Sequence, residues 1–456
     1  MRLDDGAPPG EPFEDDYPGH THDESCGELH WAVQRQVAEL AQRRYEPAVR
    51  RDILATLQRR RTARDGEVVQ FDVLPVDVGF DHLLVSGELL LGRSSYEQAG
   101  ARALLDSFGL AQVDLGCAEL DGRVVRTRNP DLPGATLDDV ARSLRRRGYT
   151  ASVDHIVPLA PVIKGLGGAE PATGPGPFSQ YGLRCEGPQA RVGIIDTGIS
   201  AEIRDDHWLA RVPRDGNIDP LDDLPTRDGY LDFAAGHGTF VSGIIAQVAP
   251  GADIRVYRAL DGDGIGGERQ VACAMIRAVK DDGCQILNLS LGGQTPDTVP
   301  PVAISAALEV ISEIEQERGQ KVVIVAAAGN YADNTPCWPA AFRKVVSVAA
   351  LGPDMQPTTW SSRGYWVTCS TIGQGLLSTY VEGQESAAVD PAPDVFPRDA
   401  WAVWNGTSFA APQVAGAVAR MAQDLGITPH EALVRLLRAG RPIPDFGQAL
   451  RILPGL

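Results

Sequence analysis

The chain has 456 residues, of which 43% are hydrophobic, and its formal net charge is −18. This length and apolar content predict two or three domains with packed cores and exclude a wholly disordered chain. A chain with this excess of negative charge is repelled by phosphate backbones, so we expect no nucleic acid partner.

The sequence begins MRLDDGAPPGEPFEDD, without the basic start and apolar run of a secretory signal. No apolar stretch approaches the roughly 20 residues needed to span a bilayer. We therefore expect a cytoplasmic protein with no membrane partner. The seven cysteines are too few for a disulfide framework in a chain of this length, and mostly thiols are expected.

Residues 1–66 form the first expected region. The acidic start, rich in Pro, Gly and Asp, is predicted to be disordered. From Gly27 to Arg64 the apolar residues recur at helical spacing. We assign no function to this region.

Residues 67–160 predict a ferredoxin-like α+β domain. Asp121-Gly122 is a hairpin turn signal, and Thr136 is a plausible helix cap. The predicted elements, in order, are a strand at His82–Leu91, a helix at Tyr96–Phe108, two strands within Ala111–Arg128, a helix at Leu137–Arg147 and a strand at Ala151–Leu159. This β-α-β-β-α-β order is that of a ferredoxin-like sandwich.

Residues 161–189 are rich in Gly and Pro and predict a linker. From residue 190 to residue 456, short apolar runs alternate with helical patterns. The predicted buried strands are Val192–Ile195, Asp253–Tyr257, Ile286–Leu289, Val322–Ala327 and Val345–Ala349. This alternation predicts an α/β domain with a doubly wound parallel sheet.

Three motifs at strand ends or helix starts carry the residue types of nucleophilic catalysis. Ile194-Ile-Asp-Thr-Gly places Asp196 at a strand end, and Gly236-His-Gly-Thr places His237 at a helix start. Asn405-Gly-Thr-Ser-Phe-Ala-Ala-Pro places Ser408 at a helix N-terminus, where partial positive charge favours an attacking oxygen. A serine hydroxyl needs a base, imidazole can supply one, and a carboxylate orients the imidazole. A fourth run, Val325-Ala-Ala-Ala-Gly-Asn, ends in Asn330, whose amide can donate to an oxyanion.

The four motifs in this order resemble those of the subtilisin-like (subtilase) serine proteases over residues 190–440. The resemblance implies a serine endopeptidase in which Asp196 orients, His237 is the general base and Ser408 attacks a polypeptide substrate. Asn330 and the Ser408 backbone N–H would form the oxyanion hole. Each residue alone could instead cap a helix or end a strand.

The resemblance also implies two Gly-rich segments that bind an extended peptide by β-augmentation, although ordinary turns are the alternative. The implied substrate-binding residues are Gly264, Ile265, Gly266, Ser290, Leu291, Gly292, Gly293, Ala328 and Gly329. The expected S1 pocket walls are apolar or neutral, which favours an uncharged side chain before the scissile bond. The resemblance implies that Cys337 and Cys369 meet near this pocket, with two buried thiols as the alternative.

No metal and no cofactor is predicted. Calcium-dependent relatives interrupt the helix after the catalytic histidine with a ligand loop, whereas residues 244–250 run straight on here. Asp261 and Asp263 favour a turn over an ion site, and the His/Cys cluster of residues 20–30 matches no zinc spacing. Phe240 and Gln413 replace histidines often found in the family, neither of them in the triad.

Subtilases commonly carry an inhibitory propeptide with the ferredoxin-like order. The resemblance therefore implies that residues 67–160 are an intramolecular inhibitor, with an unrelated interaction domain as the alternative. Two other functions stay open for the whole chain: a catalytically idle fold that binds peptides or proteins, and a processing protease dedicated to one precursor.

Overall fold

The computed structural model describes most of the chain. The described residues are 24–45, 47–62, 68–76, 79–159, 168–175, 190–387 and 393–455. The predicted disorder of the first residues, two of the histidines of the His/Cys cluster and much of the predicted linker lie outside them. None of the helices within these ranges combines the length and apolarity needed to cross a membrane.

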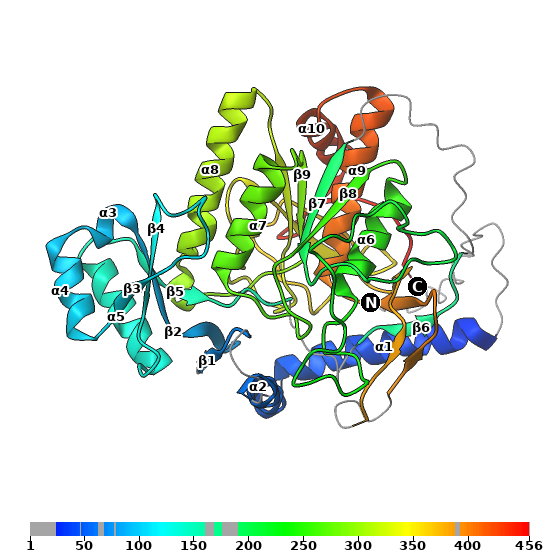
Figure 1. Ribbon diagram of the computed structural model, residues 1–456. Helices are drawn as coiled ribbons and strands as arrows, with labels where there is room; N and C mark the ends of the chain where they lie inside the picture. Colours follow the sequence, from blue (N-terminus) through cyan, green and yellow to red (C-terminus); the bar gives the residue numbers. More distant parts are fainter. Residues whose placement is uncertain are drawn as a thin grey trace, which may run out of the picture.

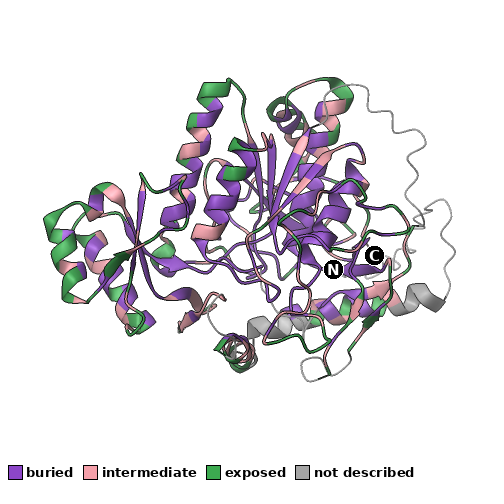
Figure 2. Ribbon diagram, viewed as in Figure 1, coloured by how far each residue is buried: buried purple, intermediate pink, exposed green. Residues whose placement is uncertain are grey.

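An eight-stranded sheet forms the centre of the molecule, with strand order β17-β18-β12-β11-β10-β9-β7-β8 (Figure 1). The strands are β7 (Arg191–Asp196), β8 (Asp253–Arg258), β9 (Ile286–Leu289), β10 (Val323–Ala327), β11 (Val345–Leu351), β12 (Cys369–Ile372), β17 (Arg441–Ile443) and β18 (Gly447–Ala449). Strands β7 to β12 run parallel. Their apolar runs are almost wholly buried (Figure 2), as expected for a sheet covered on both faces.

Helices cover both faces of this sheet. On one face lie α6 (His237–Val248) and α9 (Thr407–Leu425), with α10 (Pro429–Ala439) against α9. On the other face lie α7 (Glu268–Lys280) and α8 (Val302–Arg318). A smaller sheet contains β13 (Leu376–Thr379), β16 (Trp401–Trp404) and β6 (Glu170–Ala172). The remaining short elements are the 3-10 turn Pro296–Thr298, β14 (Gly383–Gln384) and β15 (Val395–Phe396).

The described residues between 68 and 159 form a second layered unit, called here the N-terminal unit. Its elements are β1 (Phe71–Leu74), β2 (His82–Gly92), α3 (Arg93–Tyr96), α4 (Ala99–Ser107), β3 (Ala111–Val113), β4 (Val124–Arg128), α5 (Gly134–Arg146) and β5 (Ala151–His155). Strand β2 pairs antiparallel with both β4 and β5, which gives the order β5-β2-β4-β3, and β1 pairs with the first residues of β2. Helices α4 and α5 cover one face, and the other face packs on α7 and α8.

Several predicted boundaries in the N-terminal unit were wrong. Helix α5 begins at Gly134 after Pro133, so Thr136 is inside the helix rather than its cap. Strands β3 and β4 are joined by a ten-residue loop, not by a tight turn at Asp121-Gly122. Strand β5 ends at His155, because the chain then leaves the sheet. Local sequence propensity does not determine these boundaries, because they depend on tertiary contacts with the rest of the molecule.

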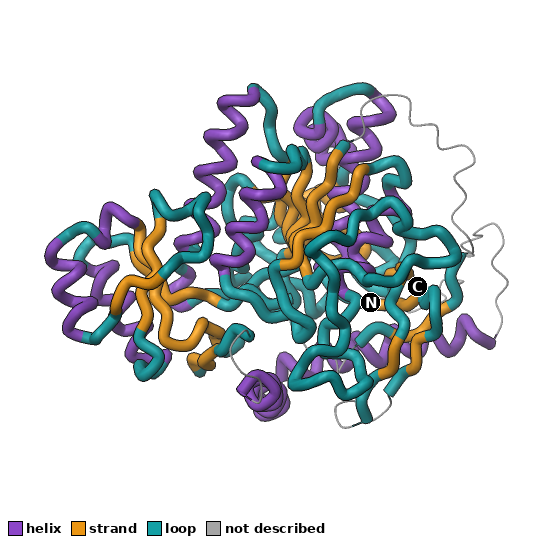
Figure 3. The backbone as a smooth tube through the Cα atoms, viewed as in Figure 1, coloured by secondary structure: helices purple, strands orange, loops and turns teal. Residues whose placement is uncertain are grey.

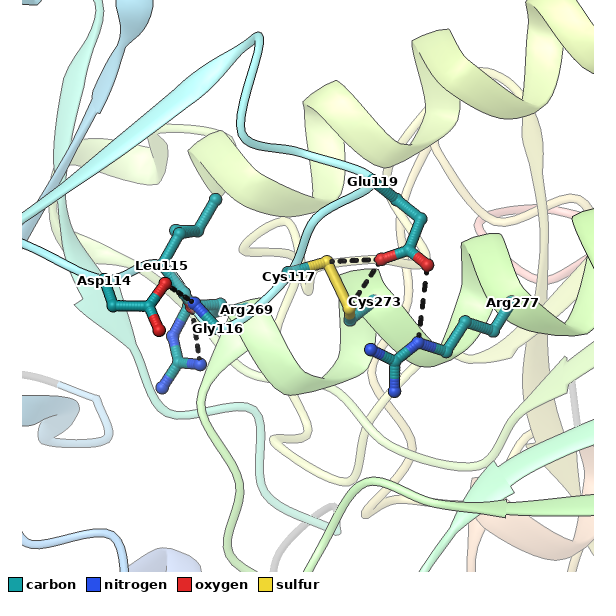
Figure 4. Close-up of a disulfide and its surroundings, with 8 residues drawn as sticks. All are labelled: Asp114, Leu115, Gly116, Cys117, Glu119, Arg269, Cys273 and Arg277. Atoms are coloured by element: carbon teal, nitrogen blue, oxygen red, sulfur yellow. Dashed lines mark hydrogen bonds and ion pairs between the residues drawn. A yellow bond between two sulfur atoms is a disulfide. The ribbon is translucent and has the colours of Figure 1, made fainter.

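The loop between β3 and β4 holds a disulfide from Cys117 to Cys273 on α7, with a Cα–Cα distance of 5.9 Å (Figure 4). The prediction of thiols was wrong for these two cysteines, which are 156 residues apart in sequence. Two polar contacts flank the bond: the guanidinium of Arg269 donates to the Leu115 carbonyl at 2.9 Å, and that of Arg277 lies 3.6 Å from the Glu119 carboxylate. The N-terminal unit is therefore covalently joined to the helical face of the central sheet.

Two further expectations need correction. The helical pattern of residues 27–64 forms two helices, α1 (Glu24–Tyr45) and α2 (Pro47–Thr62). The predicted linker contains β6, which pairs antiparallel with β16. A three-residue strand next to Gly and Pro is too short for period-two alternation to reveal it.

Candidate active site

Asp196 and His237 meet at the carboxyl edge of the central sheet. Asp196 is the last residue of β7, and His237 is the first residue of α6. His237 Nδ1 lies 2.8 Å from Asp196 Oδ1, and both side chains are buried. Asp196 Oδ1 also accepts the Thr197 backbone N–H at 2.8 Å. The carboxylate is therefore held in place beside the imidazole.

Ser408 is the second residue of α9 and lies close to the end of β9. Its hydroxyl donates to the Ser290 carbonyl at 3.0 Å, and the Ser290 hydroxyl donates to the Ser408 carbonyl at 2.6 Å. Among the described residues, no hydrogen bond joins His237 to Ser408. Such bonds are often long before substrate binds.

Asn330 follows β10 and faces the start of α9. Its Oδ1 accepts the Thr407 backbone N–H at 3.0 Å and the Thr407 hydroxyl at 2.9 Å. With Oδ1 engaged in this way, Nδ2 is the amide atom that can donate to an oxyanion beside Ser408. The neighbouring Gly329 is tied to the same threonine, since its N–H donates to Thr407 Oγ1 at 3.0 Å.

The two Gly-rich segments predicted to bind substrate lie on either side of one extended stretch of this chain. Val157 N–H donates to the Gly266 carbonyl at 2.8 Å, and Leu159 N–H donates to the Gly264 carbonyl at 3.1 Å. On the other side, Gly292 N–H donates to the Pro158 carbonyl at 2.9 Å. Figure 3 shows this stretch running from the N-terminal sheet toward the central one.

Two of the other predicted substrate-binding residues, Ile265 and Gly293, lie beside this stretch. Ile265 packs against Ile156, and Gly293 pairs with Trp338 in an isolated antiparallel bridge. Leu291 and Ala328 are fully buried.

Cys337 and Cys369 are both buried and unbonded, so the two-thiol alternative holds for this pair. Burial raises the pKa of both thiols, which keeps them protonated at neutral pH.

Asp219 is a buried residue of the site that the sequence analysis missed. Its Oδ2 accepts from the Thr197 hydroxyl and from the Gly236 N–H, each at 2.9 Å. These two donors are adjacent to Asp196 and His237, so Asp219 connects the two motifs. Burial raises its pKa to about 6. It lies in a loop without periodicity, and nothing in the sequence marks it out.

One group of potential metal ligands is found among the described residues: Cys117, Glu119 and Cys273. Zinc binds thiolates, whereas these two sulfurs are bonded to each other. This group does not fit a metal ion while the disulfide is intact.

Known proteins are similar to this chain over the part that contains Asp196, His237, Asn330 and Ser408. The model of the Subtilase family matches residues 187–439. Thermitase of Thermoactinomyces vulgaris is 30% identical over 249 residues, which cover 52% of this chain and 77% of that protein. Subtilisin DY of Bacillus licheniformis is 28% identical over 247 residues, which cover 51% of this chain and 77% of that protein.

A solved structure is similar over a longer part of the chain. Fervidolysin of Fervidobacterium pennivorans, described as a keratinolytic enzyme related to subtilisin, aligns with a TM-score of 0.52 at 21% identity. The alignment covers 81% of this chain and 60% of that one. At this identity the likeness concerns the fold alone. It extends beyond the part of the chain that the family model matches.

The family match spans more than half of the chain, and the chain therefore belongs to the subtilase family. It is a subtilisin-like serine endopeptidase, and the predicted subtilisin-like α/β fold is confirmed.

Proposed function

We propose that the chain hydrolyses peptide bonds through an acyl-enzyme formed on Ser408. His237 takes the serine proton and returns it to the leaving amine, and Asp196 holds the imidazole and stabilises its charged form. The observation that carries this proposal is the buried 2.8 Å contact between His237 and Asp196 beside the helix that begins with Thr407-Ser408. The Asn330 amide and the Ser408 backbone N–H stabilise the oxyanion.

Asn330→Ala is expected to lower kcat roughly 100- to 1,000-fold, because the amide bonds the oxyanion only as it forms. KM for a peptide substrate should change little. Steady-state kinetics with a chromogenic peptide measures both constants. An effect confined to KM would contradict the oxyanion role.

We also propose that the N-terminal unit is a ferredoxin-like, propeptide-type domain that keeps the enzyme inactive. The supporting observation is the set of three backbone hydrogen bonds that Val157, Pro158 and Leu159 make with Gly266, Gly292 and Gly264. A substrate would use the same pairing, so the two compete for the cleft.

Separately expressed residues 67–160 are expected to inhibit the peptidase part at micromolar concentration. In the intact chain the tether supplies a high effective concentration, so modest affinity is enough to silence the enzyme. The inhibition constant against a peptide substrate measures this, with both pieces shown to be folded by circular dichroism. If folded pieces show no inhibition, the N-terminal unit is a recruitment module instead.

The disulfide predicts how the two parts behave after a cut. Once the chain is cut between residues 160 and 189, the N-terminal unit should stay attached through Cys117–Cys273. Electrophoresis without reductant should show one species, and a dithiol should separate it into two. Cys273→Ser should separate without reductant, whereas Cys284→Ser, which changes a free buried cysteine, should not. Two species without reductant in the unmutated protein would rule out the covalent link.

A further inference from the structure

Helices α1 and α2 precede the N-terminal unit and are not explained by the proposed function. Together they are called here the strap. Close to the strap lie three carboxylates, Asp232, Asp261 and Asp263, called here the rim carboxylates. Asp263 directly precedes Gly264, and Asp261 lies two residues before Asp263. Gly264 and Gly266 bind the Val157–Leu159 stretch, so these two carboxylates lie at the rim of the cleft.

The rim carboxylates are deeply buried for acidic groups. The side chains of Asp232 and Asp263 are 1% and 0% exposed, and that of Asp261 is 17% exposed. Burial, with the neighbouring charge of Asp263 as the second cause, raises the pKa of Asp232, whereas the charge of Arg60 lowers it. Buried carboxylates that lie this close to one another need neighbouring cations to remain ionised.

Two adjacent arginines of α2 supply those cations. Arg60 Nη2 lies 2.8 Å from Asp232 Oδ1 and 3.3 Å from Asp263 Oδ1. Arg61, fully buried, contacts Asp261 Oδ2 through Nη1 at 2.8 Å and Nη2 at 2.5 Å. Both terminal nitrogens of Arg61 bind one oxygen of Asp261, and Arg60 bridges Asp232 and Asp263. Hydrogen bonds between charged groups of this kind are stronger than those between neutral groups.

Each guanidinium also lies over an aromatic ring. Arg60 is 4.9 Å from the ring centre of Phe233, and Arg61 is 5.8 Å from that of Phe71. Such stacking is available to arginine in particular, because its charge is planar and weakly hydrated.

Apolar contacts place α2 over the part of the cleft that holds the Val157–Leu159 stretch. Leu57 of α2 is buried in one cluster with Ile265 of the substrate-binding segment and Ile156, next to the Val157–Leu159 stretch. The arginine pair therefore fixes a helix whose apolar side covers the inhibitory stretch.

The other helix of the strap contacts the segment that leads to Ser408. Gln36 of α1 is fully buried, donates to the Val403 carbonyl at 3.1 Å and accepts from the Asn405 side-chain amide. Leu40 packs against Ala350 and Trp360. In Figure 1, α1 runs beside β6 and away from the N-terminal unit, so the two helices reach different parts of the cleft region.

We propose that the rim carboxylates are a binding site for a pair of adjacent arginines on a helix, and that Arg60–Arg61 occupy it to hold the strap closed over the cleft. The partner that fits this surface is a helical segment with an arginine pair beside a leucine, and in this chain that segment is α2. This proposal rests on the proposed function, since it adds a second closure to the N-terminal unit.

The test uses the full chain and the rate at which a fluorophosphonate probe labels Ser408. The R60A/R61A double variant should label at least about tenfold faster than the unmutated chain, because each arginine holds a buried carboxylate. Arg59→Ala is the matched control: Arg59 is exposed on the same helix, and its guanidinium contacts Thr56 within that helix. Equal rates for the double variant and the unmutated chain would overturn the proposal.

If the unpaired rim carboxylates unfold the double variant, a second pair of variants tests the strap through α1 instead. Gln36→Ala removes the α1 contact without leaving a buried charge, and Gln34→Ala changes an exposed residue of the same helix. Labelling should accelerate in the first and not in the second, and equal rates in both would again count against the strap. If Ser408 is unlabelled in every variant and also after removal of the N-terminal unit, the proposed catalytic function has failed.

Discussion

Ser408→Ala is expected to abolish turnover, with a fall of about a millionfold in kcat, the size seen when subtilisin loses its nucleophile. The hydroxyl lies at the N-terminus of α9, next to the Ser290 carbonyl, and is the attacking atom of the proposed mechanism. No other group of the site can replace it in forming the acyl-enzyme. Peptide hydrolysis by the activated enzyme, followed to the detection limit, measures the effect.

The control for this variant is Ser312→Ala on α8, a half-buried serine on the opposite face of the central sheet. It should keep the full rate. If Ser408→Ala kept a rate within tenfold of the unmutated enzyme, Ser408 would not be the nucleophile.

Asp196→Asn is expected to lower kcat about 10,000-fold, as the same change does in a chymotrypsin-type triad. The structure explains the size. His237 Nδ1 lies 2.8 Å from Asp196 Oδ1, and an amide at this position no longer enforces the tautomer that leaves Nε2 able to accept the serine proton. Binding of a peptide substrate should be nearly unchanged, so the loss is in kcat.

Asp281→Asn, which alters an exposed carboxylate at the end of α7, is the matched control and should behave like the unmutated enzyme. A loss in KM alone for Asp196→Asn would contradict the assigned role. Thermal unfolding of both variants separates a catalytic loss from a folding defect.

The sequence predicted the central sheet well, because buried parallel strands are continuous apolar runs and each ends at a polar motif. Ile286–Leu289 was predicted with the bounds that β9 has, and β7 and β10 differ from prediction by a residue or so at the ends. The polar residues after these strands meet because the carboxyl ends of parallel strands share one edge. For that reason the motifs were expected along one edge of the sheet, and the resemblance to the subtilases implied that Asp196, His237, Asn330 and Ser408 form one site.

The features that the sequence did not predict depend on contacts between distant segments. Cys117 and Cys273 belong to different units, and cysteine spacing does not give connectivity. The strap showed only a helical period, which does not say what its buried face covers. Arg60 and Arg61 look like part of a solvated basic face until α2 is placed against the rim carboxylates. Asp261 and Asp263 were predicted as turn residues, and their arginine partners were not foreseen.

The measurement that tests the central claim most directly is intact and peptide mass spectrometry of the chain after a fluorophosphonate probe, with the N-terminal unit cut and released by a dithiol. The account predicts one adduct per molecule, located on Ser408 and absent from Ser408→Ala. The opposite result would be no adduct on the folded, released enzyme, or an adduct on another residue, and either would show that this site does not work as a serine peptidase.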